Sequence, residues 1–85
     1  MITPTVKSLL LTEKLKRTDA AAALGITAQA MSNKYNRDSF TADDLVKLAT
    51  AAGYSLGFIR KRDGLQITFP APVEAGPVEG QDQTK

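Results

Sequence analysis

The stretch that most constrains how this chain can fold is DAAAALGITAQA, residues 19–30. Four consecutive alanines at residues 20–23 favour a helix, because alanine is the best helix former. Gly25 suits the left-handed backbone conformation that closes many helices. The pattern therefore predicts a short helix over about residues 17–24, a tight turn, and a further helix over about residues 27–35.

The two predicted helices have different roles. A small residue at Ala20 or Ala21 lets the backbones approach closely, as two helices joined by a tight turn require. If Met31 and Tyr35 face inward, one face of the helix over 27–35 remains free at 100° per residue. The outward positions are Ala28, Gln29, Ser32, Asn33 and Asn36, with Lys34 at the edge. This face is polar, almost uncharged and lined by short side chains.

Two further helices flank this pair. The first is predicted over about residues 4–15, with Thr3 as its N-cap. The second is predicted over about residues 41–52, with Thr41 as its N-cap and a glycine just past its end. Each helix carries apolar residues at helical spacing, which indicates a small helical core.

The segment YSLGFIRKRDGLQITF predicts a hairpin over about residues 55–69. Aromatic and β-branched residues flank Asp63-Gly64, which is a strong hairpin signal. A two-residue turn there would place Phe58 opposite Phe69 and gather one apolar face, whereas a three-residue loop would divide that face. The shorter turn is therefore preferred, and its apolar face contains Leu56, Phe58, Leu65, Ile67 and Phe69.

Composition divides the chain into a domain over residues 1–69 and an acidic tail over residues 70–85. The first part holds ten Lys and Arg against six Asp and Glu, and the second holds one against three. Three of the four prolines fall in the second part, which has no aromatic residue. Such a segment cannot offset its own ordering entropy, so we expect it to be disordered.

Residue types weigh against an enzyme. The chain has no Cys and no His, so it lacks the usual general base and the commonest metal ligands. Asp43 and Asp44 are adjacent and diverge by 100° on a helix, so stabilisation of the helix start explains them better than catalysis. We expect no catalytic residues, cofactor or metal. The apolar run at residues 9–11 is far too short for a membrane span, so we expect a soluble, cytoplasmic protein.

The segment LKRTDAAAALGITAQAMSNKYNR, followed by DDLVKLATAAG, resembles the Cro/C1-type (XRE-like) helix-turn-helix of phage and bacterial repressors. The resemblance covers about residues 5–53, and the hairpin resembles the carboxy-terminal strands of small Cro-type repressors. It implies a mainly α fold: a lambda-repressor-like bundle of about four helices followed by a small C-terminal β-hairpin of two antiparallel strands. It also implies a nucleoid-associated homodimeric repressor that reads operator DNA with the helix over 27–35 in the major groove.

The resemblance assigns roles by position. The base-reading and groove-lining residues would be Thr27, Ala28, Gln29, Ser32 and Asn33. Amide side chains suit this role, because Gln and Asn bond bidentately to adenine in the major groove. Contacts to the DNA backbone would come from Arg17, Lys34, Asn36 and Arg37. For Arg37, an ion pair with Asp38 is an equally good interpretation of the sequence.

The hairpin is the expected dimer interface, because a two-stranded sheet leaves an edge free for pairing across a two-fold axis. The residues expected there are Phe58, Ile59, Ile67 and Phe69. The cations at residues 60–62 are better explained as protection of an exposed strand edge than as a DNA contact. Two alternatives stay open: an antitoxin-like or accessory subunit that acts with a protein partner through the hairpin or tail, and a protein-interaction module on the same fold.

Overall fold

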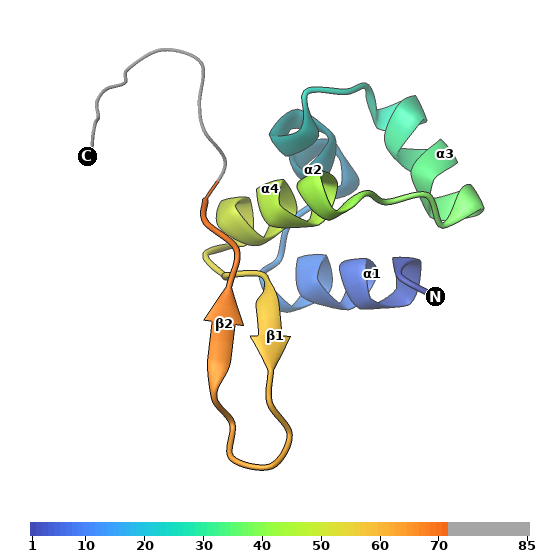
Figure 1. Ribbon diagram of the computed structural model, residues 1–85. Coiled ribbons are helices and arrows are strands. Elements are labelled where there is room, and N and C mark those ends of the chain that lie inside the picture. Colours follow the sequence, from blue (N-terminus) through green and yellow to red (C-terminus); the bar gives the residue numbers. More distant parts are fainter. Residues whose placement is uncertain (72–85) are drawn as a thin grey trace.

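The computed structural model describes residues 1–71, in which four helices precede an antiparallel pair of strands (Figure 1). The elements are α1 (Thr3–Thr12), α2 (Arg17–Leu24), α3 (Ala28–Arg37), α4 (Ala42–Ala52), β1 (Gly57–Ile59) and β2 (Gln66–Thr68). The predicted fold class is confirmed. The expected tail lies almost entirely outside the described residues, and the division at residue 69 stays a prediction. Within residues 1–71, no helix is both long and apolar enough to span a bilayer.

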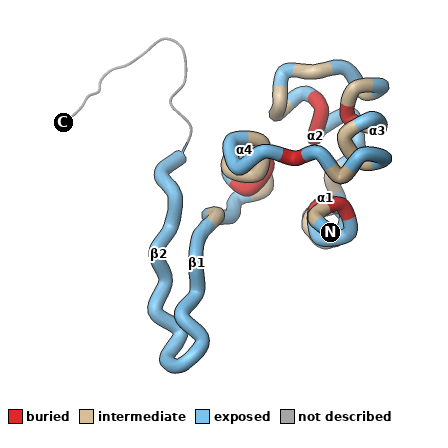
Figure 2. Tube along the Cα trace, turned by 45° about the vertical axis from the view of Figure 1, so that its right-hand side comes forward, coloured by how far each residue is buried: buried red, intermediate tan, exposed pale blue. Residues whose placement is uncertain are grey.

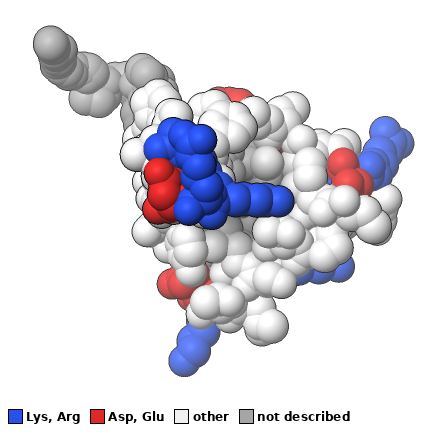
Figure 3. All heavy atoms as spheres, turned by 60° about the horizontal axis from the view of Figure 1, so that its bottom comes forward, with Lys and Arg blue, Asp and Glu red and all other residues white. Residues whose placement is uncertain are grey.

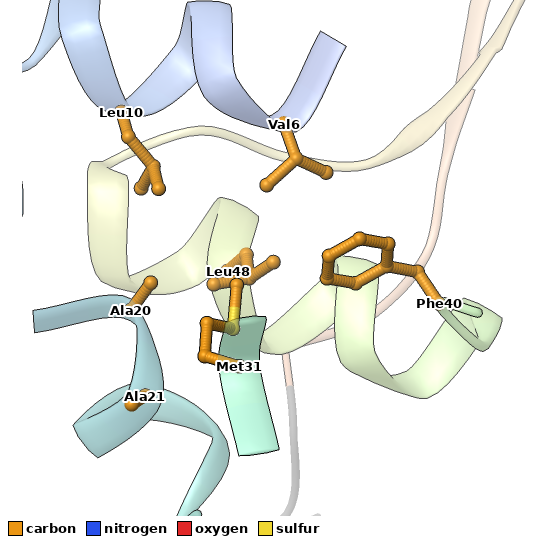
Figure 4. Packing of buried hydrophobic residues seen from close by; sticks show 7 residues of the cluster. All are labelled: Val6, Leu10, Ala20, Ala21, Met31, Phe40 and Leu48. Atoms are coloured by element: carbon orange, nitrogen blue, oxygen red, sulfur yellow. The ribbon is translucent and has the colours of Figure 1, made fainter. Parts of the chain in front are cut away.

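A small core joins the four helices, and Figure 4 shows its side chains converging between them. Met31 of α3 is the one side chain in the described chain that is completely buried, at 0% exposure. The buried members of this core cluster are Val6, Leu10, Ala20, Ala21, Met31, Phe40 and Leu48. Leu24, Ile26 and Tyr35 are partly buried and pack against the cluster. The sequence therefore identified the inward face of α3 correctly.

The alanine contact lies where the sequence predicts it. Both Ala20 and Ala21 are buried, and α2 packs against α3 and α4. Gly25 ends α2 with a φ of +70°, the left-handed conformation that glycine adopts without a Cβ penalty. The amide of Ile26 then donates to the Ala21 carbonyl oxygen at 2.9 Å. A three-residue turn, residues 25–27, thus leads directly into α3.

The two later helices begin at the predicted caps. The Thr27 hydroxyl oxygen accepts a hydrogen bond from the Ala30 amide at 3.0 Å. The Thr41 hydroxyl oxygen accepts from the Asp44 amide, also at 3.0 Å, while the Asp44 carboxylate accepts from the Thr41 amide. Both contacts satisfy amides that the first helical turn leaves without a partner.

Helix α1 differs from its prediction at both ends. Thr3 is not the N-cap but the first residue of the helix, and α1 has no capping side chain from its own sequence. The helix ends at Thr12 rather than near residue 15, because Lys14 has a φ of +58° and the chain turns there. The amide of Leu15 donates to the Leu10 carbonyl oxygen at 2.8 Å, which closes this turn.

The predicted two-residue hairpin turn is wrong. Phe58 lies opposite Ile67, and the Arg60 amide donates to the Leu65 carbonyl oxygen, so residues 61–64 form the loop. A two-residue type I′ turn needs a positive φ at both central residues, and Gly64 has one whereas Asp63 does not. The strands are also shorter than predicted. Because the register differs by two residues, the predicted apolar face is nevertheless retained.

Candidate nucleic-acid interface

The polar face predicted for α3 is accessible in the structure. Thr27, Gln29, Asn33 and Asn36 are exposed, while Ala28 and Ser32 are half-buried. All belong to α3 or to its cap, and Met31 anchors the opposite side of the same helix in the core. The helix therefore presents a continuous row of amides, hydroxyls and a methyl group to the surroundings.

Two amides on this face are in contact. The Gln29 Nε2 donates to Asn33 Oδ1 at 3.4 Å, across one turn of α3. The bond is long, yet it holds the two amides side by side, and Gln29 Oε1 and Asn33 Nδ2 remain available to another molecule. A neighbouring acceptor and donor are what the edge of adenine requires in the major groove.

A cation from α2 reaches across to the same face. Arg17 Nη1 donates to Ser32 Oγ at 3.0 Å, which joins the first residue of α2 to the middle of α3. Burial raises the pKa of the nearby Tyr35 hydroxyl, and the positive charge of Arg17 partly offsets that rise. Arg17 has no carboxylate partner among the described ion pairs. It therefore supplies positive charge at the edge of the polar face.

Lys34 forms an ion pair with α4. Its Nζ lies 2.8 Å from Asp44 Oδ2 of α4, and the two side chains are only 25% and 15% exposed. Burial alone would raise the pKa of Asp44, but the hydrogen bonds from Lys34 and Thr41, together with the Lys34 charge, hold that pKa below its usual value. Sequence reasoning assigned Asp44 only to the start of α4. The ion pair with Asp44 links α3 to α4, which is a second role for Lys34 besides the predicted contact to the DNA backbone.

The last turn of α3 holds the remaining predicted residues. Arg37 is exposed and forms no ion pair with a described residue, so the alternative pairing with Asp38 is not observed there. The Asp38 carboxylate instead accepts from the amides of Ile2 and Thr3 at the start of α1. Sequence reasoning missed this contact, and it also missed Lys7, whose ammonium lies 5.0 Å from the centre of the Tyr35 ring.

The hairpin carries the apolar residues expected at an interface, and Figure 2 shows it as exposed along its whole length. Phe58, Ile59 and Ile67 are 64–67% exposed, and Phe69 is 38% exposed. The Phe58 and Phe69 rings pack on each other with centroids 5.6 Å apart. An apolar groove between α1 and α4 adjoins the root of the hairpin and shares Leu56 with it.

The cations of residues 60–62 lie at the tip of the hairpin, in and next to its loop, and away from α3 (Figure 1). Arg60 is paired with Asp63 through both carboxylate oxygens, at 3.0 and 2.8 Å. Arg60 holds the pKa of Asp63 below its usual value. Figure 3 views the molecule from its hairpin end and shows a large cluster of charged side chains there, separated from the others by uncharged surface.

Two helices joined by a tight turn, with a small-residue contact and an exposed polar second helix, define a helix-turn-helix protein. A sequence model of the bacteriophage CI repressor helix-turn-helix domain matches residues 11–65, from the end of α1 to the residue before β2. The chain belongs to the bacteriophage CI repressor helix-turn-helix domain family.

One relative of this family is similar over nearly the whole chain. The repressor protein CI of Enterobacteria phage phi80 is 30% identical over an alignment 87 residues long, and this alignment covers 96% of this chain. The chain spans 37% of the length of that relative. No solved structure matches the chain significantly.

Proposed function

We propose that this chain binds duplex DNA in a sequence-specific manner, with α3 in the major groove, and acts as a transcriptional repressor. The observation that carries the proposal is the exposed amide face of α3, with Gln29 and Asn33 aligned and Arg17 beside them. Membership in the CI repressor helix-turn-helix family supports it. The phi80 relative bears the name of a repressor.

Base readout would come from the accessible side chains near the start and middle of α3. Gln29 and Asn33 can each bond an adenine edge, Ser32 suits either base type, and a methyl group can pack on thymine. The full set proposed for base reading and groove lining is Thr27, Ala28, Gln29, Ser32 and Asn33. Their short length requires the α3 backbone to enter the groove deeply, which a helix free on one side can do.

Phosphate contacts would supply affinity that does not depend on sequence. Arg17 and Arg37 are exposed cations, and Asn36 is an exposed donor next to Arg37. Lys34 can join them only by leaving Asp44, which would remain as a half-buried carboxylate without its cation. Arg17 and Arg37 are therefore the main backbone contacts of the proposal, and Lys34 is a weaker one.

We further propose that the chain acts as a homodimer through the hairpin. Phe58, Ile67 and Phe69 form a contiguous exposed apolar face, which is uncommon in a monomer, and Ile59 is exposed on the opposite face. A lone two-stranded hairpin is also at best marginally stable in water. The proposed interface residues are Phe58, Ile59, Ile67 and Phe69. A two-fold arrangement would present two α3 helices to half-sites about 34–36 Å apart. An accessory subunit that binds another protein would use the same surface.

Selection from a random pool of duplex DNA at about 0.1 M salt tests the proposal, because exposed charges are screened beyond about 10 Å under these conditions. The expected result is an enriched two-fold symmetric site. Enrichment of a single half-site would support base reading and contradict the homodimer. If no sequence is enriched, the DNA-reading role of α3 is wrong.

Two substitutions separate base reading from phosphate binding. Gln29→Ala should cost about 1–3 kcal/mol and relax the preference at one base pair, whereas Arg17→Ala should weaken binding to all sequences and reduce its salt dependence. Thr50→Ala on α4 is the control, because it removes an exposed polar side chain outside both α3 and the proposed hairpin interface. An equal loss on every sequence after Gln29→Ala would contradict the role of that residue.

A further inference from the structure

Asp38 fixes the end of α3 to the start of α1. Its Oδ1 accepts hydrogen bonds from the amides of Ile2 at 2.8 Å and Thr3 at 2.6 Å. The Thr3 hydroxyl lies 2.9 Å from the same oxygen and 3.0 Å from the Tyr35 carbonyl oxygen. With its single proton it donates to one of them at a time. Thr3 is also buried, at 7% exposure, so solvent cannot readily replace these partners.

This contact replaces a cap that α1 lacks. Helix α1 has no capping side chain of its own, so without Asp38 the amides at its start would lose their partner. Asp38 holds a φ of +53°, in the left-handed region that glycine occupies more easily. A glycine would ease the backbone but would remove the carboxylate. Asp38 thus ends α3 and also caps the start of α1.

Helix α3 depends on such contacts for its direction. Met31 is its one buried residue, and its other links to the bundle include Arg17 on Ser32 and Asp44 on Lys34. Asp38 acts at the C-terminal end of the helix, while Gln29 lies near the opposite end. A recognition element must be held to within about 0.5 Å and 10–20° of its working geometry. A change at Asp38 would therefore alter the direction of the whole outer face.

We propose that Asp38 and Thr3 are positioning residues that set the angle at which α3 presents its outer face, so that discrimination between DNA sequences depends on a contact remote from the bases. The inference rests on the proposed DNA-binding function and extends it. The Oδ1 atom of Asp38 is occupied by the start of α1, so the role of the residue in this proposal is to place α3 and not to read bases.

The test compares the affinity for a selected duplex with that for an unrelated duplex. Asp38→Gly removes the carboxylate while permitting the left-handed backbone, and Asp38→Asn restores an oxygen acceptor. The ratio of the two affinities should fall about tenfold in Asp38→Gly, the effect of a mismatched base pair, and recover largely in Asp38→Asn. Thr3→Val, which removes only the hydroxyl, should lower it less.

Tyr54→Phe is the matched control. It cuts a contact of the same kind, the 2.8 Å bond from the Tyr54 hydroxyl to the Glu13 carboxylate, which joins α1 to the root of the hairpin without touching α3. This variant should leave the affinity ratio unchanged. If Asp38→Gly lowers the melting temperature but leaves the ratio as it was, Asp38 is only a cap and the proposal is wrong.

A measurement without DNA separates this proposal from the proposed function. Residual dipolar couplings of the amides in α2 and α3 report the angle between the two helices. Asp38→Gly should change that angle by more than about 10°, the tolerance of a working recognition site. An unchanged angle overturns the positioning role even if DNA binding is established. If no duplex is selected, a changed angle still supports the positioning of α3 while the DNA-binding proposal fails.

Discussion

The helical bundle and the hairpin differ in how their apolar residues are used. In the bundle, Met31 is fully buried and Leu48 is 2% exposed. In the hairpin, no residue of either strand is buried, and Phe58 and Ile67 are about two-thirds exposed. A bundle buries its own apolar surface, whereas a two-stranded sheet with both faces open needs another surface. The bundle is therefore self-sufficient, and the stability of the hairpin depends on what covers it.

Removal of the central side chain should destabilise the helical bundle. Met31→Ala deletes the one fully buried side chain of the described chain and should lower the free energy of unfolding by about 2–5 kcal/mol. Urea unfolding followed by circular dichroism at 222 nm measures the loss. A loss below about 1 kcal/mol would mean that the core collapses around the site, contrary to the close packing described for it.

A charge in the hairpin should weaken self-association without unfolding the bundle. Ile67→Asp places a carboxylate on the apolar face and should weaken self-association by about 2 kcal/mol or more, as at an interface hot spot. Sedimentation equilibrium measures the dimer constant. Leu11→Asp is the matched control, because Leu11 is 80% exposed on α1. If both variants associate like the parent chain, the hairpin is not the interface.

A methyl group at Gly57 should destabilise the hairpin and leave the bundle unchanged. An added Cβ would lie 2.5 Å from the Ile67 carbonyl oxygen and 2.8 Å from the Thr68 Cα, so the strands would have to separate or shift. Such overpacking costs about 1–3 kcal/mol, and here it should be confined to the hairpin. Amide exchange should accelerate in β1 and β2 and stay unchanged in α2 and α4. Equal acceleration in both regions would mean that they unfold as one unit.

Lowering the pH should produce the smallest loss of stability, and this loss should come mainly from the bundle. The hydrogen bonds from the Thr3 amide and hydroxyl hold the pKa of Asp38 below its usual 3.8. The contacts of Asp44 hold its pKa below 3.8 as well, despite burial. Because the folded pKa values are lower than the unfolded ones, the stabilisation is present above about pH 4 and is lost as the pH falls through the folded values.

Urea unfolding between pH 6 and pH 2.5 checks this dependence. The free energy of unfolding should decline only below about pH 4, the unfolded pKa of an aspartate. Asp44→Asn should be less stable than the parent at pH 6 and should show a shallower decline. A decline of the same size in Asp44→Asn would assign the effect to other carboxylates.

The same contrast explains how much the sequence could predict. Local signals located the bundle well: Gly25, Thr27 and Thr41 mark helix ends, and each acts through residues no more than four positions away. The polar face of α3 followed from the position of Met31 on the helix. The apolar face of the hairpin was also predictable, because side chains alternate along each strand and the observed loop is two residues longer than the predicted one, an even difference that keeps the same residues on one face.

Contacts between distant residues could not be predicted in this way. Asp38 and Thr3 are 35 residues apart, and nothing near Thr3 indicates that its cap lies beyond α3. The pairing of Lys34 with Asp44 requires α3 and α4 to be placed first. The hairpin register was missed because Asp63-Gly64 suits two kinds of turn, and the bond between Arg60 and Asp63 accompanies the longer loop.

The contact between Arg17 and Ser32 has a consequence for any mutational survey of this surface. Because one side chain donates to the other at 3.0 Å, removing either changes the state of both. Their contributions to binding should therefore be non-additive, and a double-mutant cycle should give a coupling energy of about 0.5–3 kcal/mol. A recognition code fitted to α3 alone would assign to Ser32 an energy that belongs jointly to a residue of α2.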